Sequence, residues 1–120
     1  YIRLKLEMAR EMPLQSRLFA NEILHGAPAI GEFLRGPLKD LVDKKSKVIR
    51  RWVAEGRLAQ IDPVHLIFMI WATTQHYADF DVQVRAVLGE SGLGESGEAD
   101  PISVAEKTVM TIFCNGLKPR

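Results

Sequence analysis

Trp71 and Gln75 lie four residues apart in the apolar stretch IFMIWATTQHYADF, residues 67–80. On a helix, residues at this spacing project over the same patch of surface. An indole can stack on a flat ring, and a primary amide donates and accepts side by side, which matches the N–H and C=O edge of a pyrimidine or another cyclic amide. The spacing alone also fits a core tryptophan and a glutamine bonded to a backbone carbonyl, and this second interpretation is the more common one.

The remaining reactive side chains form no catalytic or metal-binding motif. His65 and His76 are eleven residues apart, and neither belongs to an HExxH or Cys/His cluster. Cys114 is the single cysteine, so it forms no internal disulfide, and its apolar surroundings favour a small core residue. The sequence contains no GxSxG, P-loop or GxGxxG motif. We therefore expect no enzyme, no metal and no cofactor.

The main basic cluster is KKSKVIRR, residues 44–51. At helical spacing, four of its side chains share one face, which could meet phosphates: Lys44, Lys47, Arg50 and Arg51. Acidic residues at 40 and 43 interrupt this face, and no aromatic residue is interleaved for base stacking. A solvated helix face is therefore favoured over a nucleic-acid site. Lys45 falls in the apolar stripe of the same helix, so its ammonium must reach water or meet an acceptor inside.

Prolines and glycines predict an all-α fold, with Pro just inside helix starts and Gly just past helix ends. The predicted helices are 1–11, 13–26, 29–34, 37–56, 63–80, 81–88 and 101–116, with a break at Gly36-Pro37. The segment 89–100, GESGLGESGEAD, is predicted to be an exposed loop. No period-2 strand pattern and no internal repeat occur.

Length and composition fit one globular domain of 120 residues, 47% hydrophobic and 26% charged. There is no run of 18 apolar residues and no signal-peptide pattern, so we expect a cytoplasmic protein that does not enter a membrane. Because Tyr1 is not a methionine, we also expect that the chain begins part-way through a longer protein.

Two of the predicted helices have unusually wide apolar surfaces. Residues 64–78 carry no charged side chain apart from histidines, so this helix is apolar all round. Such a helix is either central in the bundle or packed against a second copy of the protein. The last helix, residues 101–116, has a broad stripe formed by Ile102, Ala105, Val109, Ile112, Phe113 and Leu117.

The segments YIRLKLEMAR, SRLFANEILHGAP, IDPVHLIFMIWATTQHYADF and GLKPR resemble the C-terminal part of TetR-family transcriptional regulators. The resemblance implies a helical bundle of the TetR-family C-terminal regulatory domain, with residues 1–120 forming an effector-binding and dimerisation domain. It also implies a homodimer, joined by an intersubunit four-helix bundle of residues 63–80 and 101–116. Operator DNA would be bound only through an N-terminal helix-turn-helix domain, which is absent from this chain.

With this resemblance, a ligand site at Trp71 and Gln75 becomes the preferred interpretation, for a small planar effector such as uracil or thymine. We expect Phe19 and Ile23 to form the opposite wall of the pocket, and Thr74 and Ala78 its floor. The predicted dimer interface contains Met69, Thr73, His76, Phe80, Val109 and Phe113. The alternative is a helical protein-interaction module that dimerises without any small-molecule ligand.

Overall fold

The computed structural model describes residues 1–89 and 101–120, and all of its regular elements are helical. They are α1 (Ile2–Glu11), α2 (Pro13–Leu24), α3 (Gly31–Phe33), the π-helical segment η1 (Leu34–Leu38), α4 (Lys39–Ala54), α5 (Pro63–Asp79), α6 (Asp81–Leu88) and α7 (Pro101–Gly116). The described residues contain no strand, which confirms the predicted all-α class. The predicted loop lies outside the described residues from position 90 onward.

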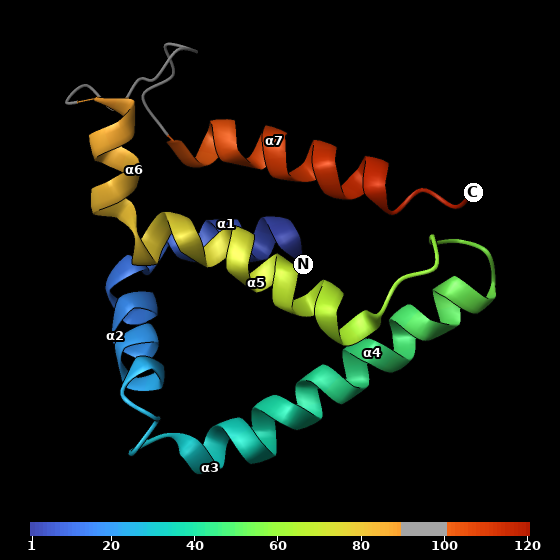
Figure 1. The fold of residues 1–120 in the computed structure, drawn as a ribbon, viewed down its shortest axis with the longest axis horizontal. Helices are drawn as coiled ribbons and strands as arrows, with labels where there is room; N and C mark the ends of the chain where they lie inside the picture. Colours follow the sequence, from blue (N-terminus) through green and yellow to red (C-terminus); the bar gives the residue numbers. More distant parts are fainter. Residues whose placement is uncertain (90–100) are drawn as a thin grey trace.

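Helix α5 occupies the centre of the molecule and contacts α1, α2, α4, α6 and α7 (Figure 1). Its residues belong to two hydrophobic clusters. The first joins α5 to α1 and α7 through Leu6, Ala9, Ala78, Ile102 and Val109, and the second joins α5 to α4 through Val42, Ile49, Leu66, Ile67 and Ile70. Ile2 and Phe113 pack against both clusters and connect them. Of the two alternatives for the apolar helix, the structure shows the central position, and packing against a second copy stays a prediction.

The helix ends are fixed by local signals that the sequence contains. After α2 and α4, the chain turns at Gly26 and Gly56, whose φ angles are 90° and 72°. At the end of α4, the Gly56 N–H donates to the Val53 carbonyl at 3.0 Å and the Arg57 N–H to the Trp52 carbonyl at 2.8 Å. This pair of bonds satisfies carbonyls that the helix leaves free, and glycine adopts the required left-handed conformation without strain.

The predicted break at Gly36-Pro37 is absent, because the chain remains helical from Gly31 to Ala54. Pro37 lies inside η1, where the helix widens to π-type geometry. A proline in a regular α-helix removes a hydrogen bond and clashes with the preceding turn, and a widened turn relieves both problems. The residues on either side of Gly36-Pro37 therefore form one bent, continuous helical segment.

The molecule is flat, with principal extents of 46 × 41 × 18 Å. Its Cα radius of gyration is 16.2 Å, whereas a compact chain of this length is expected to have about 13–14 Å. Neither α2 nor α6 contains a fully buried residue. Many large apolar side chains are correspondingly exposed, Leu18, Val82 and Val87 among them. The chain by itself therefore leaves much apolar surface uncovered.

Asp62 caps the N-terminus of α5, and its contribution to the free energy of unfolding should depend on pH. Its carboxylate accepts the His65 backbone N–H at 2.9 Å, and this bond holds the pKa of Asp62 below its ordinary value of 3.8. A lowered folded-state pKa contributes stability above the unfolded value, which is lost as the pH falls through the folded value. Asp62→Ala should therefore destabilise the protein at neutral pH, and the difference from the parent should shrink in acid.

Asp62→Asn is the matched control, because asparagine caps helices about as well as aspartate but does not titrate. Urea unfolding at neutral pH and at about pH 3 measures the free energy of unfolding of all three proteins. The stability gap between Asn and Ala at this position should change less with pH than the gap between Asp and Ala. Equal gaps between Asp and Ala at both pH values would contradict the assigned role of the carboxylate.

Candidate ligand-binding site

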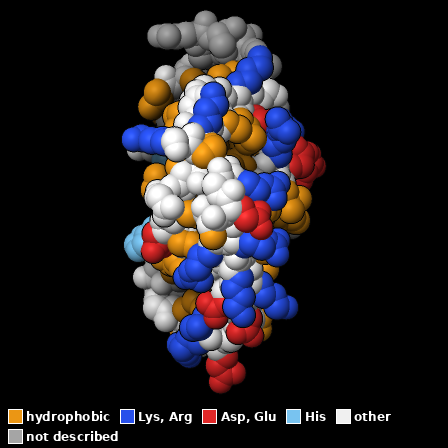
Figure 2. Space-filling view, turned by 90° about the vertical axis from the view of Figure 1, so that its right-hand side faces the viewer, with side chains coloured by type: hydrophobic (Ala, Val, Ile, Leu, Met, Phe, Trp, Pro, Cys, Tyr) orange, Lys and Arg blue, Asp and Glu red, His pale blue; other side chains and the backbone are white. Residues whose placement is uncertain are grey.

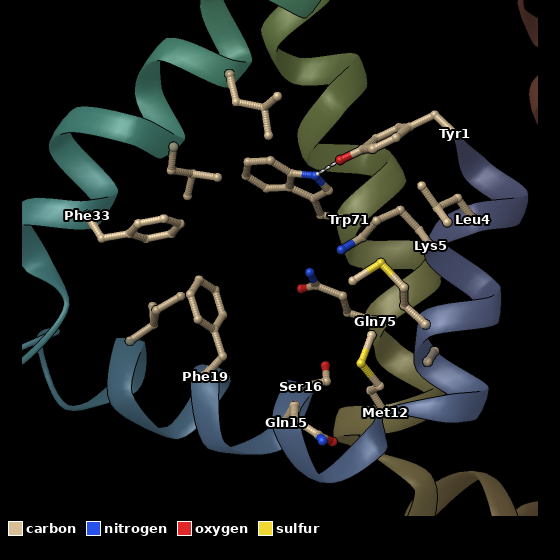
Figure 3. A pocket seen from close by; sticks show the side chains of 15 residues that line it. Tyr1, Leu4, Lys5, Met12, Gln15, Ser16, Phe19, Phe33, Trp71 and Gln75 are labelled. Carbon is tan, nitrogen blue, oxygen red and sulfur yellow. Dashed lines mark hydrogen bonds between the residues drawn. The ribbon is translucent and has the colours of Figure 1, made fainter.

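A cavity of about 490 Å³ lies between α1, α2, the α3–α4 segment and α5 (Figure 3). This volume falls in the range of small-molecule sites, which is roughly 300–1,000 Å³. The lining is mostly apolar, with a few polar groups among the aliphatic, aromatic and methionine side chains. It consists of Tyr1, Leu4, Lys5, Met8, Ala9, Met12, Gln15, Ser16, Phe19, Ile23, Phe33, Leu38, Leu41, Trp71 and Gln75.

The indole of Trp71 is held by a contact from the start of α1. Its Nε1–H donates to the Tyr1 hydroxyl at 2.8 Å, the hydrogen bond drawn in Figure 3. The Lys45 ammonium of α4 lies over the Tyr1 ring, 4.0 Å from its centroid. This cation–π contact answers how Lys45 is accommodated in the apolar stripe of its helix. Because its N–H is already bonded, Trp71 offers a ligand the face of its ring rather than a donor.

Gln75 projects into the cavity one turn after Trp71, from the same helix (Figure 3). Among the residues that the structure describes, its side-chain amide has no hydrogen-bond partner. The neighbouring Ser16 hydroxyl, by contrast, donates to the Asp79 carboxylate at 2.6 Å. A free amide in an apolar cavity can donate to and accept from one edge of a ligand.

Lys5 is the charged side chain in the cavity lining, and it reaches in from α1 (Figure 3). Burial among apolar neighbours lowers the pKa of its ammonium, and the carboxylate of Asp79 offsets part of that effect. The described residues include no carboxylate within 4.0 Å of the Lys5 ammonium. The cavity therefore contains a cation without a close counter-ion.

The structure brings together Trp71, Gln75, Phe19 and Ile23 around this one cavity. Thr74 and Ala78, which were expected to form its floor, lie elsewhere. Their relative exposures are 0% and 1%, and Ala78 packs in the cluster with α1 and α7. The Thr74 hydroxyl donates to the Ile70 carbonyl at 2.7 Å, which satisfies its polar group inside the helix. The prediction that these two residues form the cavity floor is therefore corrected, because both face the protein core.

Helix α1 and the residues that flank it supply cavity residues that were not predicted from the sequence. Tyr1, Lys5, Met8 and Met12 follow each other at intervals of three or four residues and line the cavity together. The segment YIRLKLEMAREM contains the pattern that could have identified them, because residues at this spacing share one face of a helix. The core-facing residue Leu6 lies on a different face of the same helix.

A second surface of α5 faces away from the core. Met69 and Phe80 are 56% and 55% exposed. The rings of His76 and Phe80 are stacked, with centroids 5.1 Å apart. Thr73 is half-buried, and its hydroxyl donates to the Met69 carbonyl at 3.0 Å. These four residues of the predicted interface therefore lie on the accessible side of α5.

The α7 residues of the predicted interface have other positions. Val109 is buried in the cluster formed with α1 and α5, and Phe113 is half-buried between both clusters. Val109 is thus covered by the protein's own core, whereas Phe113 is partly accessible and its place at the interface stays a prediction. Ile112 and Cys114 are exposed instead. The expectation of a buried Cys114 was wrong.

The basic side of α4 consists of exposed side chains, as the sequence analysis favoured. Lys44, Lys47, Arg50 and Arg51 are all exposed. Lys39 pairs with Asp43 one turn away, with Nζ and Oδ2 3.0 Å apart. Figure 2 shows Lys and Arg side chains interspersed with acidic ones over the side of the molecule that it displays. Within residues 1–89 and 101–120, no helix has the length and apolarity needed to cross a bilayer.

Comparison with known proteins gives one family and several close relatives. The TetR-type family model described as "YcdC-like protein, C-terminal region" matches residues 1–120. The HTH-type transcriptional regulators RutR of Escherichia coli O157:H7, Escherichia coli K12 and Shigella flexneri are each 51% identical to the chain over 120 residues. The match covers 100% of this chain and 55% of each relative, so the chain spans about half the length of these relatives.

The bond between Trp71 and Tyr1 should be measurable as an energetic coupling. In a double-mutant cycle of Trp71→Phe and Tyr1→Phe, we expect a coupling energy of about 0.5–1.5 kcal/mol in the free energy of unfolding. Tyr77→Phe is the control partner for Trp71→Phe, because no hydrogen bond joins Tyr77 to that indole in the described residues. The control cycle should be additive, and an additive Tyr1 cycle would show that the bond contributes nothing.

Proposed function

This chain belongs to the TetR family, as a YcdC-like C-terminal region, and we propose that it binds a small planar effector and joins two copies of a transcriptional regulator. Operator DNA would be bound by a helix-turn-helix domain N-terminal to these residues, as the description of its relatives as HTH-type regulators suggests. The proposed role is recognition, and it includes no catalytic step.

The observation that carries the effector proposal is the free amide of Gln75 beside the ring of Trp71. A buried glutamine in a core normally bonds to a neighbouring backbone group. Gln75 has no such partner among the described residues, and its side chain points into a cavity of about 490 Å³. Gln75 is half-buried, and its amide is open to water from the cavity, so a ligand with a complementary edge can replace that water and pair with both amide groups.

The chemistry of these two side chains supports a flat cyclic amide, such as uracil or thymine. Gln75 can donate to a ring carbonyl and accept from the adjacent ring N–H. The indole of Trp71, held in place by Tyr1, provides a surface for stacking, and Phe19 and Phe33 lie across the cavity (Figure 3). The aromatic rings favour a flat ligand, and the amide favours a ligand whose edge carries a matching donor and acceptor.

The exposed apolar side of α5, with that of α7, supports dimerisation. Met69, Phe80 and Ile112 would be covered in a bundle of α5 and α7 from two copies. Interfaces of this kind are large and more apolar than the ordinary protein surface. The flat shape of the chain and its many exposed large apolar side chains agree with such a partner.

Regulation would follow from a shift between two packings of the helices. An effector between α1, α2, α4 and α5 stabilises the arrangement that fits it best, and α5 also carries the proposed interface. The effector shifts the equilibrium only by its difference in affinity for the two arrangements. That shift would change the separation of the two DNA-binding domains.

The effector proposal is tested by Gln75→Leu in the full-length protein. Loss of the amide should weaken uracil or thymine binding about tenfold to a hundredfold, because unpaired polar partners cost about 1–3 kcal/mol. Titration calorimetry measures the affinity, and thermal unfolding checks that the fold is intact. Gln83→Leu, the same change on the exposed surface of α6, should bind as the parent does. Undiminished affinity in Gln75→Leu would contradict the proposed site.

The dimer proposal is tested by Met69→Glu, which introduces a charge on the exposed side of α5. We expect a folded monomer at micromolar concentration, because a buried unpaired carboxylate is costly in an apolar interface. Leu24→Glu is the control, since Leu24 is 79% exposed at the far end of α2. Sedimentation velocity compares the two variants with the parent. A parent protein that sediments as a monomer would contradict the proposal.

A further inference from the structure

The cavity combines an apolar lining with one positive charge. Lys5 is the charged residue among those that line the cavity, and its side chain extends from α1 toward the space in front of Gln75 (Figure 3). Ligands that are only stacked and hydrogen-bonded need no ammonium at this position. A lysine in an apolar cavity is unfavourable unless water or an anion compensates its charge.

No carboxylate of the described residues forms an ion pair with the Lys5 ammonium, which faces the cavity. Asp79 on α5 is the carboxylate whose field reaches Lys5, but it accepts the Ser16 hydroxyl at 2.6 Å and lies beyond ion-pair distance of the ammonium. The other cation on this side, Lys45 of α4, is placed over the ring of Tyr1. Within the described part of the chain, the Lys5 ammonium therefore has no anion in contact.

A ligand that fills the cavity displaces water from around this ammonium. If the ligand is neutral, the charge loses solvation and gains only an ordinary hydrogen bond. If the ligand is anionic, the lost solvation is replaced by a charge-assisted hydrogen bond in surroundings of low dielectric constant. Burial already lowers the pKa of Lys5 in the open cavity, so a neutral ligand would add to a cost that is present before binding.

We propose that the effector binds as an anion, as a planar ring whose negatively charged acceptor meets the Lys5 ammonium while Gln75 pairs with the adjacent ring edge. This inference rests on the proposed function, because it specifies the charge of the ligand at the same site. Two sources supply such a ring. One is a cyclic imide that loses its ring proton on binding, and the other is a ring that already carries a carboxylate.

The two sources differ in proton balance. A cyclic imide such as uracil breaks one ring N–H bond, the proton leaves to the buffer, and the electron pair is shared between the ring nitrogen and its carbonyl oxygens. Lys5 remains an ammonium throughout. A ring carboxylate such as orotate is ionised before binding and releases no proton. Calorimetry in two buffers of different ionisation enthalpy counts the protons released and therefore separates these sources.

The experiment uses the full-length protein with thymine, uracil, 5-fluorouracil, 1,3-dimethyluracil and orotate as probes. Affinity should rise with the acidity of the ring N–H in the first three, and 1,3-dimethyluracil, which has no such proton, should bind worst. Lys5→Met should lower the affinity for the best-bound probe at least about tenfold and flatten the dependence on acidity. Lys5→Arg should keep the dependence, because the positive charge is retained.

Lys44→Met is the matched control, since Lys44 is exposed on α4 and does not line the cavity. It should bind every probe as the parent does. The inference is overturned if the probes bind to the parent without any dependence on acidity or charge, or if Lys5→Met keeps that dependence. A parent that binds none of the probes would instead overturn the proposed function, and calorimetry of the parent alone distinguishes that result.

Discussion

The burial of α5 is the constraint on which the rest of the molecule depends. This helix packs against α1 and α7 in one cluster and against α4 in the other, so its inner side must be apolar along its length. Its one fully buried polar side chain there, Thr74, is accommodated because its hydroxyl donates to the Ile70 carbonyl within the same helix. A charged group at this position would have no such internal partner, which explains why the buried positions of α5 carry no charge.

The sequence predicted the helices, because proline, glycine and the Asp62 cap act locally, and its strong apolar pattern singled out α5 as either the central helix or an interface helix. It also predicted that Trp71 and Gln75 face the same space, since four residues return nearly to the same side of a helix. Thr74 and Ala78 were misplaced because they lie close to Trp71 around the helix axis. A rotation of the helix by a few tens of degrees about its axis decides whether such a residue faces the cavity or the core. The pattern of apolar and polar residues in the sequence does not resolve so small a rotation.

The two residues predicted on α7 illustrate a related physical limit. A broad apolar stripe records how much of a helix is covered but not which neighbour covers it. Val109 is covered by the protein's own α1 and α5, and Cys114 is not covered within the chain. Lys5 was missed for the opposite reason, because a single lysine on a helix is usually solvated, and only the arrangement of α1, α2 and α5 encloses it.

The widened turn at η1 makes one wall of the cavity adjustable by chain length as well as by side-chain identity. Phe33 precedes this turn, Leu38 is its last residue and Leu41 follows it, and all three line the cavity. A π-type turn holds one residue more than the α-turn that it replaces, so it sets the rotation of the preceding helix relative to the following one. Removal of a single residue there would turn the two parts by about 100° relative to each other. Related proteins could thus acquire differently shaped cavities through one-residue insertions and deletions, with the core around α5 unchanged.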